Sequence, residues 1–140
     1  MAAALLFNSD GDIINAWTSL SSIMDHLVRE AEAAFLAISK ASDLLLQTLI
    51  IAGDSSLVTE SFQLDPLSSL MPWKIHYLVI KALNLLRRCS FWFIIKIPCD
   101  DNFVAHSLAI WATAHSFVGA VPPSFLLSRG LWKFDGAKPP

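Results

Sequence analysis

One aspartate, Asp54, stands where the sequence could place chemistry at the end of a buried strand. Residues 49–52 are apolar, rich in isoleucine and without alternation, and Gly53 and Asp54 follow them directly. Such a run predicts a strand buried on both faces of a parallel α/β sheet, and in such sheets ligands bind at the carboxyl ends of the strands. Asp54 is therefore a candidate functional carboxylate. The alternative is that its side chain only caps the helix that follows.

Two helical carboxylates, Glu30 and Glu32, are the next candidates. Apolar residues recur at three- and four-residue steps over residues 24–38, which predicts an amphipathic helix over residues 23–45. At about 100° per residue, Glu30 and Glu32 lie on either shoulder of the apolar stripe. Periodicity does not distinguish them, and the alternative for either is a solvent-exposed helix carboxylate.

The other elements that must position these carboxylates form an α/β domain. Strands are predicted over residues 2–7, 13–18, 49–52 and 90–97, and helices over residues 23–45, 57–62, 73–88 and 103–117. The Asp10-Gly11 pair between the first two strands predicts a hairpin, because glycine adopts the positive φ of a tight turn. The order β-β-α-β-α-α-β-α predicts one domain over residues 1–117 with helices on the sheet faces. Residues 118–140 are predicted to be an irregular tail.

Composition limits the classes of partner. Hydrophobic residues make up 54% of the chain and charged residues 16%, against about 45–50% and 25% in ordinary domains. This composition fits a deeply buried core or contact with a membrane. The net charge is −2 and the longest basic run is Arg87-Arg88, which argues against tight non-specific nucleic-acid binding. It leaves open a cation-dependent site built from carboxylates.

Neither a membrane span nor a signal peptide is predicted. Residues 102–128 contain no Asp, Glu, Lys or Arg, but polar residues recur among them and Pro122-Pro123 interrupt them. Polar groups at this density are unfavourable in hydrocarbon, so a packed final helix is expected instead. Residues 1–7 lack a positively charged start, so we expect an intracellular protein whose location is otherwise unknown. Cys89 and Cys99 match no metal-binding spacing and are predicted to be buried free thiols.

Five segments of the sequence resemble plant RNase H-like domains derived from the reverse transcriptases of non-LTR retrotransposons. In chain order they are SDGDIINAWT, REAEAAFLAISKA, IAGDSSLVTES, PWKI and PCDDNFVAHSLAIWA, within residues 2–114. The resemblance implies an RNase H-like fold, with which the predicted order of elements agrees. It also implies nucleic-acid binding and metal-dependent endonuclease cleavage of the RNA strand of RNA–DNA hybrids.

The resemblance implies a set of site residues as well. RNase H enzymes use two Mg²⁺ ions, which activate a water and stabilise the leaving oxygen, and Mg²⁺ prefers oxygen ligands. By position in the motifs, Glu32 and Asp54 correspond to two of the family's catalytic carboxylates and are the predicted metal ligands. His106 occupies the last-helix position, where standard RNase H enzymes carry Asp and some plant relatives carry His. It is the third predicted catalytic residue, near the leaving group or as a weak substitute ligand.

The start of the sequence departs from the family pattern. The family begins with a central strand that bears the first catalytic aspartate, whereas Met1 falls directly at the start of the hairpin. We therefore expect this strand and its carboxylate to be absent, Mg²⁺ binding and cleavage to be weak, and sheet edges to be unpaired. The alternatives are a non-catalytic domain that recognises the shape of a nucleic-acid duplex and a degenerate transposon-derived fragment prone to self-association.

Overall fold

A computed structural model describes residues 1–21 and 25–122 of the chain. The described residues form two compact units, one of residues 1–21 and 98–122 and the other of residues 25–97. Each unit has its own hydrophobic core. The predicted order of elements is confirmed, with a 3-10 turn added before the last helix and a short strand added after it.

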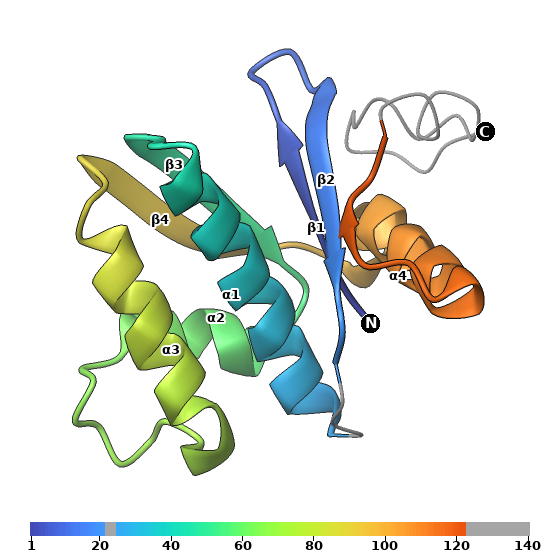
Figure 1. The fold of residues 1–140 in the computed structure, drawn as a ribbon. Coiled ribbons are helices and arrows are strands. Elements are labelled where there is room, and N and C mark those ends of the chain that lie inside the picture. Colours follow the sequence, from blue (N-terminus) through green and yellow to red (C-terminus); the bar gives the residue numbers. More distant parts are fainter. Residues whose placement is uncertain (22–24, 123–140) are drawn as a thin grey trace. The chain divides into compact units, whose positions relative to one another are not determined.

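The unit of residues 1–21 and 98–122 is an antiparallel sheet with one helix. Strands β1 (Ala2–Phe7) and β2 (Ile13–Ser19) form the predicted hairpin, and β5 (Gly119–Ala120) pairs with the other side of β2. The 3-10 turn η1 (Cys99–Asn102) leads into α4 (Phe103–His115), which packs against β1 and β2 (Figure 1). The buried residues of this core are Ala16, Leu108 and Val121.

The hairpin turn is closed by two backbone hydrogen bonds, Asn8 N to Asp12 O and Gly11 N to Asn8 O, and by the side chain of Asn8. Asn8 Oδ1 accepts hydrogen bonds from the backbone N–H groups of Asp10 and Asp12, each at 3.0 Å. Gly11 has a φ of 85°, a value that favours glycine because it has no Cβ to clash. The Asp-Gly turn predicted from the sequence is therefore confirmed, and Asn8 is the residue that organises it.

Asn8→Ala is expected to lower the free energy of unfolding by about 1 kcal/mol, because an intramolecular hydrogen bond contributes about 0.5–1.5 kcal/mol. Urea denaturation followed by circular dichroism measures the change. Asn15→Ala removes the same type of side chain from an exposed position of β2 and is the matched control. Equal effects of the two substitutions would show that Asn8 has no special role in the turn.

The unit of residues 25–97 is built around two parallel strands. In chain order its elements are α1 (His26–Asp43), β3 (Thr48–Gly53), α2 (Ser56–Gln63), α3 (Trp73–Leu86) and β4 (Phe91–Lys96). β3 and β4 pair in parallel with Thr48 opposite Phe91 and Gly53 opposite Lys96. Helices α1 and α3 pack against each other, and their buried faces share one core with the inner face of the strands (Figure 1).

The prediction that β3 is buried on both faces is wrong. Ile51 and Ile94 of the neighbouring strand are 7% and 5% exposed and belong to the core. Ile50 and Phe93, which point to the opposite face, are 58% and 39% exposed. The helices share a core with only one face of these two strands. The isoleucine-rich run is compatible with strand pairing and with one buried face. Nothing in the sequence indicates that the other face of the strand is exposed.

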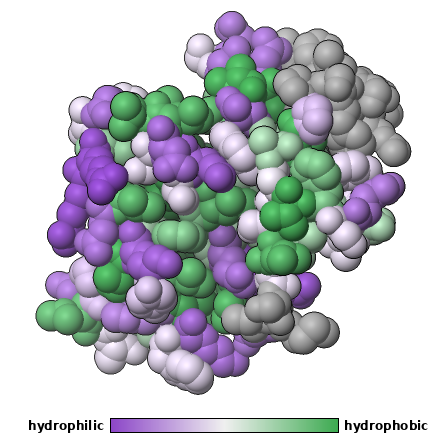
Figure 2. Space-filling view, in the orientation of Figure 1, coloured by the Kyte–Doolittle hydropathy of each residue, from purple (hydrophilic) through white to green (hydrophobic). Residues whose placement is uncertain are grey.

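The high apolar content of the chain is visible at the surface as well as in the cores. Trp73 and Tyr77 on α3 are 82% and 71% exposed. Figure 2 shows hydrophobic patches between hydrophilic ones on the face in view.

None of the helices in residues 1–21 and 25–122 is long and apolar enough to cross a membrane. Within the uncharged segment noted above, α4 ends at His115, and Ser116 has the left-handed conformation common at helix C-termini.

An ion pair links the start of α1 to the start of α3. Asp25 Oδ1 accepts a hydrogen bond from the backbone N–H of Val28 at 3.1 Å and so caps α1. Lys74 Nζ donates to Asp25 Oδ2 at 2.7 Å. Both hydrogen bonds hold the pKa of the Asp25 carboxyl below its ordinary value of 3.8, and the bond from Lys74 has the larger effect.

Lys74→Met is expected to raise the pKa of Asp25 back toward 3.8, although not fully, because the bond from Val28 remains. A carboxyl whose pKa is lowered on folding stabilises the fold above its unfolded pKa, and this contribution disappears as the pH falls through the folded pKa. The substitution should therefore reduce stability above about pH 4 and have little effect at lower pH. NMR titration of the Asp25 carboxyl measures the shift. Lys81→Met on the same helix is the control and should leave this pKa unchanged.

Candidate active site

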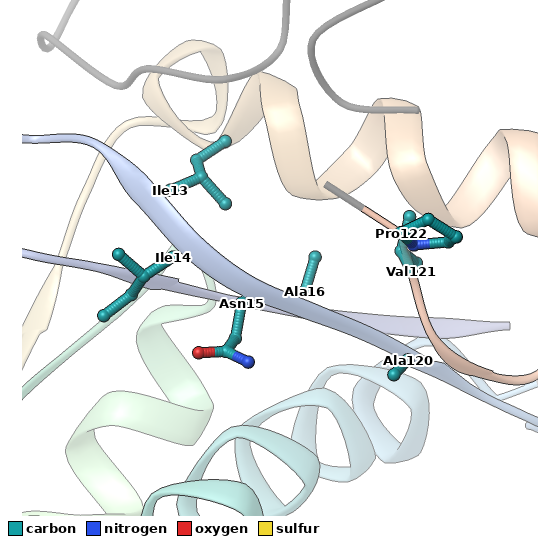
Figure 3. A pocket seen from close by; sticks show the side chains of 7 residues that line it. All are labelled: Ile13, Ile14, Asn15, Ala16, Ala120, Val121 and Pro122. Atoms are coloured by element: carbon teal, nitrogen blue, oxygen red, sulfur yellow. The ribbon is translucent and has the colours of Figure 1, made fainter. Parts of the chain in front are cut away.

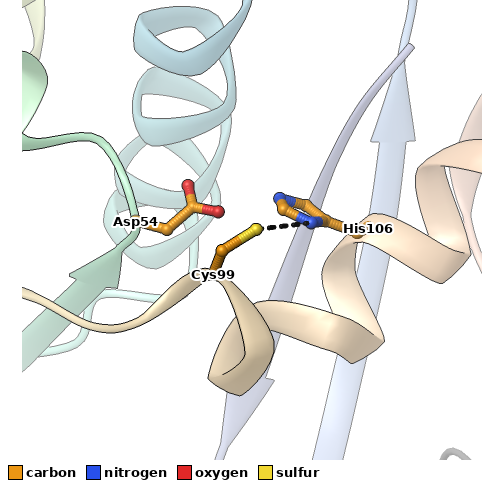
Figure 4. Close-up of side chains that lie close together, drawn as sticks. All are labelled: Asp54, Cys99 and His106. Atoms are coloured by element: carbon orange, nitrogen blue, oxygen red, sulfur yellow. Dashed lines mark hydrogen bonds between the residues drawn. The ribbon is translucent and has the colours of Figure 1, made fainter.

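Asp54 lies at the carboxyl end of β3, as predicted. The strand ends at Gly53, whose carbonyl accepts a hydrogen bond from Ile97 N at 2.8 Å, and Asp54 follows directly (Figure 4). The N-cap of α2 is Ser55, whose Oγ accepts a hydrogen bond from Val58 N at 3.3 Å. The N-cap of α2 is therefore Ser55 rather than Asp54. Its side chain is half-buried.

The structure distinguishes the two carboxylates of α1. Glu30 Oε1 lies 3.5 Å from Nε2 of His26, one turn earlier on the same helix. Glu32 lies one turn after the buried Val28 and is half-buried at the border of the core-facing side. Glu30 thus contacts His26 on its own helix, whereas Glu32 lies where the side of α1 meets the core. The contact between His26 and Glu30 could have been predicted from the sequence, since the two residues are four positions apart on one helix.

His106 lies on α4, on the side away from the buried Val104 and Leu108. Its Nδ1 is 3.8 Å from Sγ of Cys99, which belongs to the preceding 3-10 turn (Figure 4). The imidazole is half-buried. The imidazole therefore contacts a thiol that lies seven residues earlier in the chain.

The prediction of two buried thiols is wrong. Cys99 is exposed, and Cys89 is half-buried. Cys89 follows α3 and donates a hydrogen bond to the carbonyl oxygen of Leu46 at 3.4 Å. Cys99 lies in the 3-10 turn η1 that follows Pro98, and its side chain is open to solvent there.

The predicted site residues are distributed over both units. Glu32 and Asp54 belong to the unit of residues 25–97, on α1 and at the end of β3, two elements that contact each other. His106 belongs to the unit of residues 1–21 and 98–122. The structure therefore establishes the local setting of each side chain, and their assembly into one active site stays a prediction.

The chemistry of the donor atoms decides which of these residues suit a hard cation. Glu32 and Asp54 supply carboxylate oxygens, the ligands that Mg²⁺ prefers. His106 and its neighbour Cys99 supply nitrogen and sulfur, which suit softer ions such as Zn²⁺. The two carboxylates fit the Mg²⁺ that the family resemblance implies, and the imidazole fits it less well.

A pocket of about 220 Å³ lies on the unit of residues 1–21 and 98–122, between β2 and the segment after β5 (Figure 3). Its lining residues are Ile13, Ile14, Asn15, Ala16, Ala120, Val121 and Pro122. Asn15 is the one polar side chain among these seven, and none of the seven has an ionisable side chain. Acid–base or metal chemistry therefore does not belong to this pocket.

Comparison with known proteins places the chain in a family. Residues 1–112 match the family described as reverse transcriptase-like. Two solved structures share its fold: RNase H1 from the halophilic archaeon Halobacterium salinarum NRC-1 and the N-terminal RNase H domain of rv2228c from Mycobacterium tuberculosis, solved as a fusion with maltose-binding protein. No curated protein matches the sequence.

The likeness to the two structures covers most of each chain. For the archaeal enzyme the TM-score is 0.72 at 23% identity, over 81% of this chain and 84% of the other. For the mycobacterial domain the TM-score is 0.71 at 17% identity, over 81% of each chain. An α/β chain with this order of elements and these structural relatives is an RNase H-like domain, so the predicted fold is confirmed. The chain belongs to the reverse transcriptase-like family.

Proposed function

We propose that this domain binds nucleic acid, with RNA–DNA hybrids as its substrate class, and that it cleaves them weakly or not at all. The observation that carries the proposal is the position of Asp54, directly after the carboxyl end of β3, in a domain of RNase H-like fold. A carboxylate at a strand end is where an α/β sheet binds its ligands.

Glu32 and Asp54 would hold Mg²⁺ through their carboxylate oxygens. When bound, the metal supplies an activated water and stabilisation of the leaving oxygen in an in-line displacement. His106 would hold a proton near the leaving oxygen or act as a weak ligand. This division of roles follows from the donor atoms, because an imidazole exchanges protons near neutral pH and a carboxylate does not.

Two features support weak activity. His106 stands where standard members of the family carry a carboxylate, so the ligand set of this chain has fewer hard oxygen donors. The net charge of −2 also provides little attraction for phosphates, so affinity is expected to be low and to fall as salt increases.

The experiment uses a labelled RNA–DNA hybrid, with DNA and RNA duplexes of the same sequence as controls. We expect the full chain to retain the hybrid in preference to the DNA duplex at low salt, and to cut its RNA strand slowly when Mg²⁺ is present. Binding that persists in EDTA without any cleavage would favour a non-catalytic binding domain. Failure to bind any of the three duplexes would contradict the proposal.

A further inference from the structure

The contact between Cys99 and His106, which is also a residue of the proposed active site, could itself bind a ligand. Cys99 is exposed in η1, and His106 lies in the first turns of α4, seven residues later. Their Sγ and Nδ1 atoms are 3.8 Å apart (Figure 4). Both residues lie within the unit of residues 1–21 and 98–122, so their placement depends on one unit alone.

The distance between the two atoms matches that of two ligands on one zinc ion. In a tetrahedral site with Zn–S of about 2.3 Å and Zn–N of about 2.0–2.1 Å, the sulfur and nitrogen are about 3.6 Å apart. The observed distance between Sγ and Nδ1 is 3.8 Å. A small rotation of either side chain would bring the two atoms to the distance found in a zinc site. A hydrogen bond between a thiol and an imidazole has a similar length, and the experiment described below separates the two.

The surroundings of the pair also favour a cation. Asp100 and Asp101 lie next to Cys99 in the same 3-10 turn and bring two negative charges to it. They offset the positive end of α4, which by itself would disfavour a cation. Cys99 is open to solvent, so an ion can reach the thiol and retain water in its remaining coordination positions.

We propose that Cys99 and His106 form a half-site for a borderline-soft divalent cation of the Zn²⁺ class. Binding forms a zinc–sulfur and a zinc–nitrogen bond, and the thiol proton passes to solvent, without any change of oxidation state. Mg²⁺ is not expected to bind at this site because it prefers oxygen donors. The site shares His106 with the proposed active site, but its binding of a cation is measured in the absence of any hybrid.

The test measures how fast iodoacetamide alkylates each cysteine of the full, reduced and metal-free chain, followed by mass spectrometry. At a Zn²⁺ concentration ten times the dissociation constant, occupancy should slow alkylation of Cys99 about tenfold. Cys89, which is bonded to Leu46 O, is the internal control and should react at an unchanged rate. Mg²⁺ at millimolar concentration should protect neither thiol.

Two histidine variants separate metal binding from a simple hydrogen bond. His106→Gln should abolish the protection by Zn²⁺, whereas His115→Gln on the same helix, whose ring is bonded to Trp111 O, should retain it. With Co²⁺ as the probe, a thiolate-to-cobalt absorption band should appear in the parent chain and be lost in Cys99→Ser, which keeps a small polar side chain. Thermal unfolding checks that each variant is folded.

Equal protection of Cys89 and Cys99, or protection that persists in His106→Gln, would overturn the proposal. So would the absence of any effect of Zn²⁺ on Cys99. None of these results bears on hybrid binding, so the failure of this site and the failure of the proposed function are distinguishable.

Discussion

Leu108→Ala is expected to lower the free energy of unfolding by about 2–5 kcal/mol. Leu108 is 0% exposed and packs with Ala16 and Val121 in the core of its unit. Removal of three carbon atoms loses their transfer free energy and leaves a cavity. The two buried neighbours, Ala16 and Val121, are small and have few atoms with which to fill it. We expect the loss to be in the upper part of this range, a large fraction of the 5–15 kcal/mol that stabilises a typical protein.

The matched control for this substitution lies two residues further along α4. Ile110 is 71% exposed, so Ile110→Ala removes a branched aliphatic side chain of the same size without creating a cavity. Its effect should stay within about 0.5 kcal/mol. Urea denaturation of both variants, followed by circular dichroism, gives the two values. Similar values would show that α4 is not anchored through Leu108.

The elements of the fold were predictable from the sequence wherever the apolar pattern changed its period. The switch from alternation in residues 13–18 to three- and four-residue steps after residue 23 separated β2 from α1. Pro98 and the polar run after it separated β4 from α4. Strand β5 was missed because its two residues, Gly119 and Ala120, carry no periodic pattern. It exists through pairing with β2, which also accepts a hydrogen bond from Val121 N to Ala16 O at 2.9 Å.

The setting of the site was less predictable than the fold. That Asp54 follows a strand could be predicted from Gly53 and the apolar run before it. Which residue caps α2 could not, because Asp54 and Ser55 are adjacent and both are good caps. The exposure of Cys99 could not be predicted either, because Cys99 lies in a turn between two periodic segments and no apolar pattern shows which way its side chain points.

Residues 123–140 and 22–24 lie outside the described structure, so the prediction of an irregular tail is tested only at its start. There, Gly119 and Ala120 are paired with β2 instead of being irregular. The irregular character of the remainder of the tail stays a prediction from composition.

Asp54→Asn is expected to reduce any Mg²⁺-dependent cleavage of an RNA–DNA hybrid by at least about 100-fold. The substitution keeps the size of the side chain and removes its negative charge. A residue that only supports a metal ligand typically contributes about 10–100-fold to metal affinity or activity. Loss of a direct ligand is expected to have a larger effect. The same variant should weaken Mg²⁺ binding measured by NMR, as a loss of the shifts that Mg²⁺ causes at the end of β3 and in the first turn of α2. This second measurement tests the site even when cleavage is too slow to detect.

Glu60→Gln provides the matched control, because Glu60 is an exposed carboxylate on α2 in the same unit. Its removal changes the net charge as Asp54→Asn does, so a general electrostatic effect on the binding of a phosphate backbone should appear equally in both variants. A specific metal site predicts that Asp54→Asn and Glu32→Gln lose Mg²⁺ binding and that Glu60→Gln retains it. If all three variants behave alike, the carboxylate at the end of β3 contributes only charge, and the predicted ligand pair of Glu32 and Asp54 is wrong.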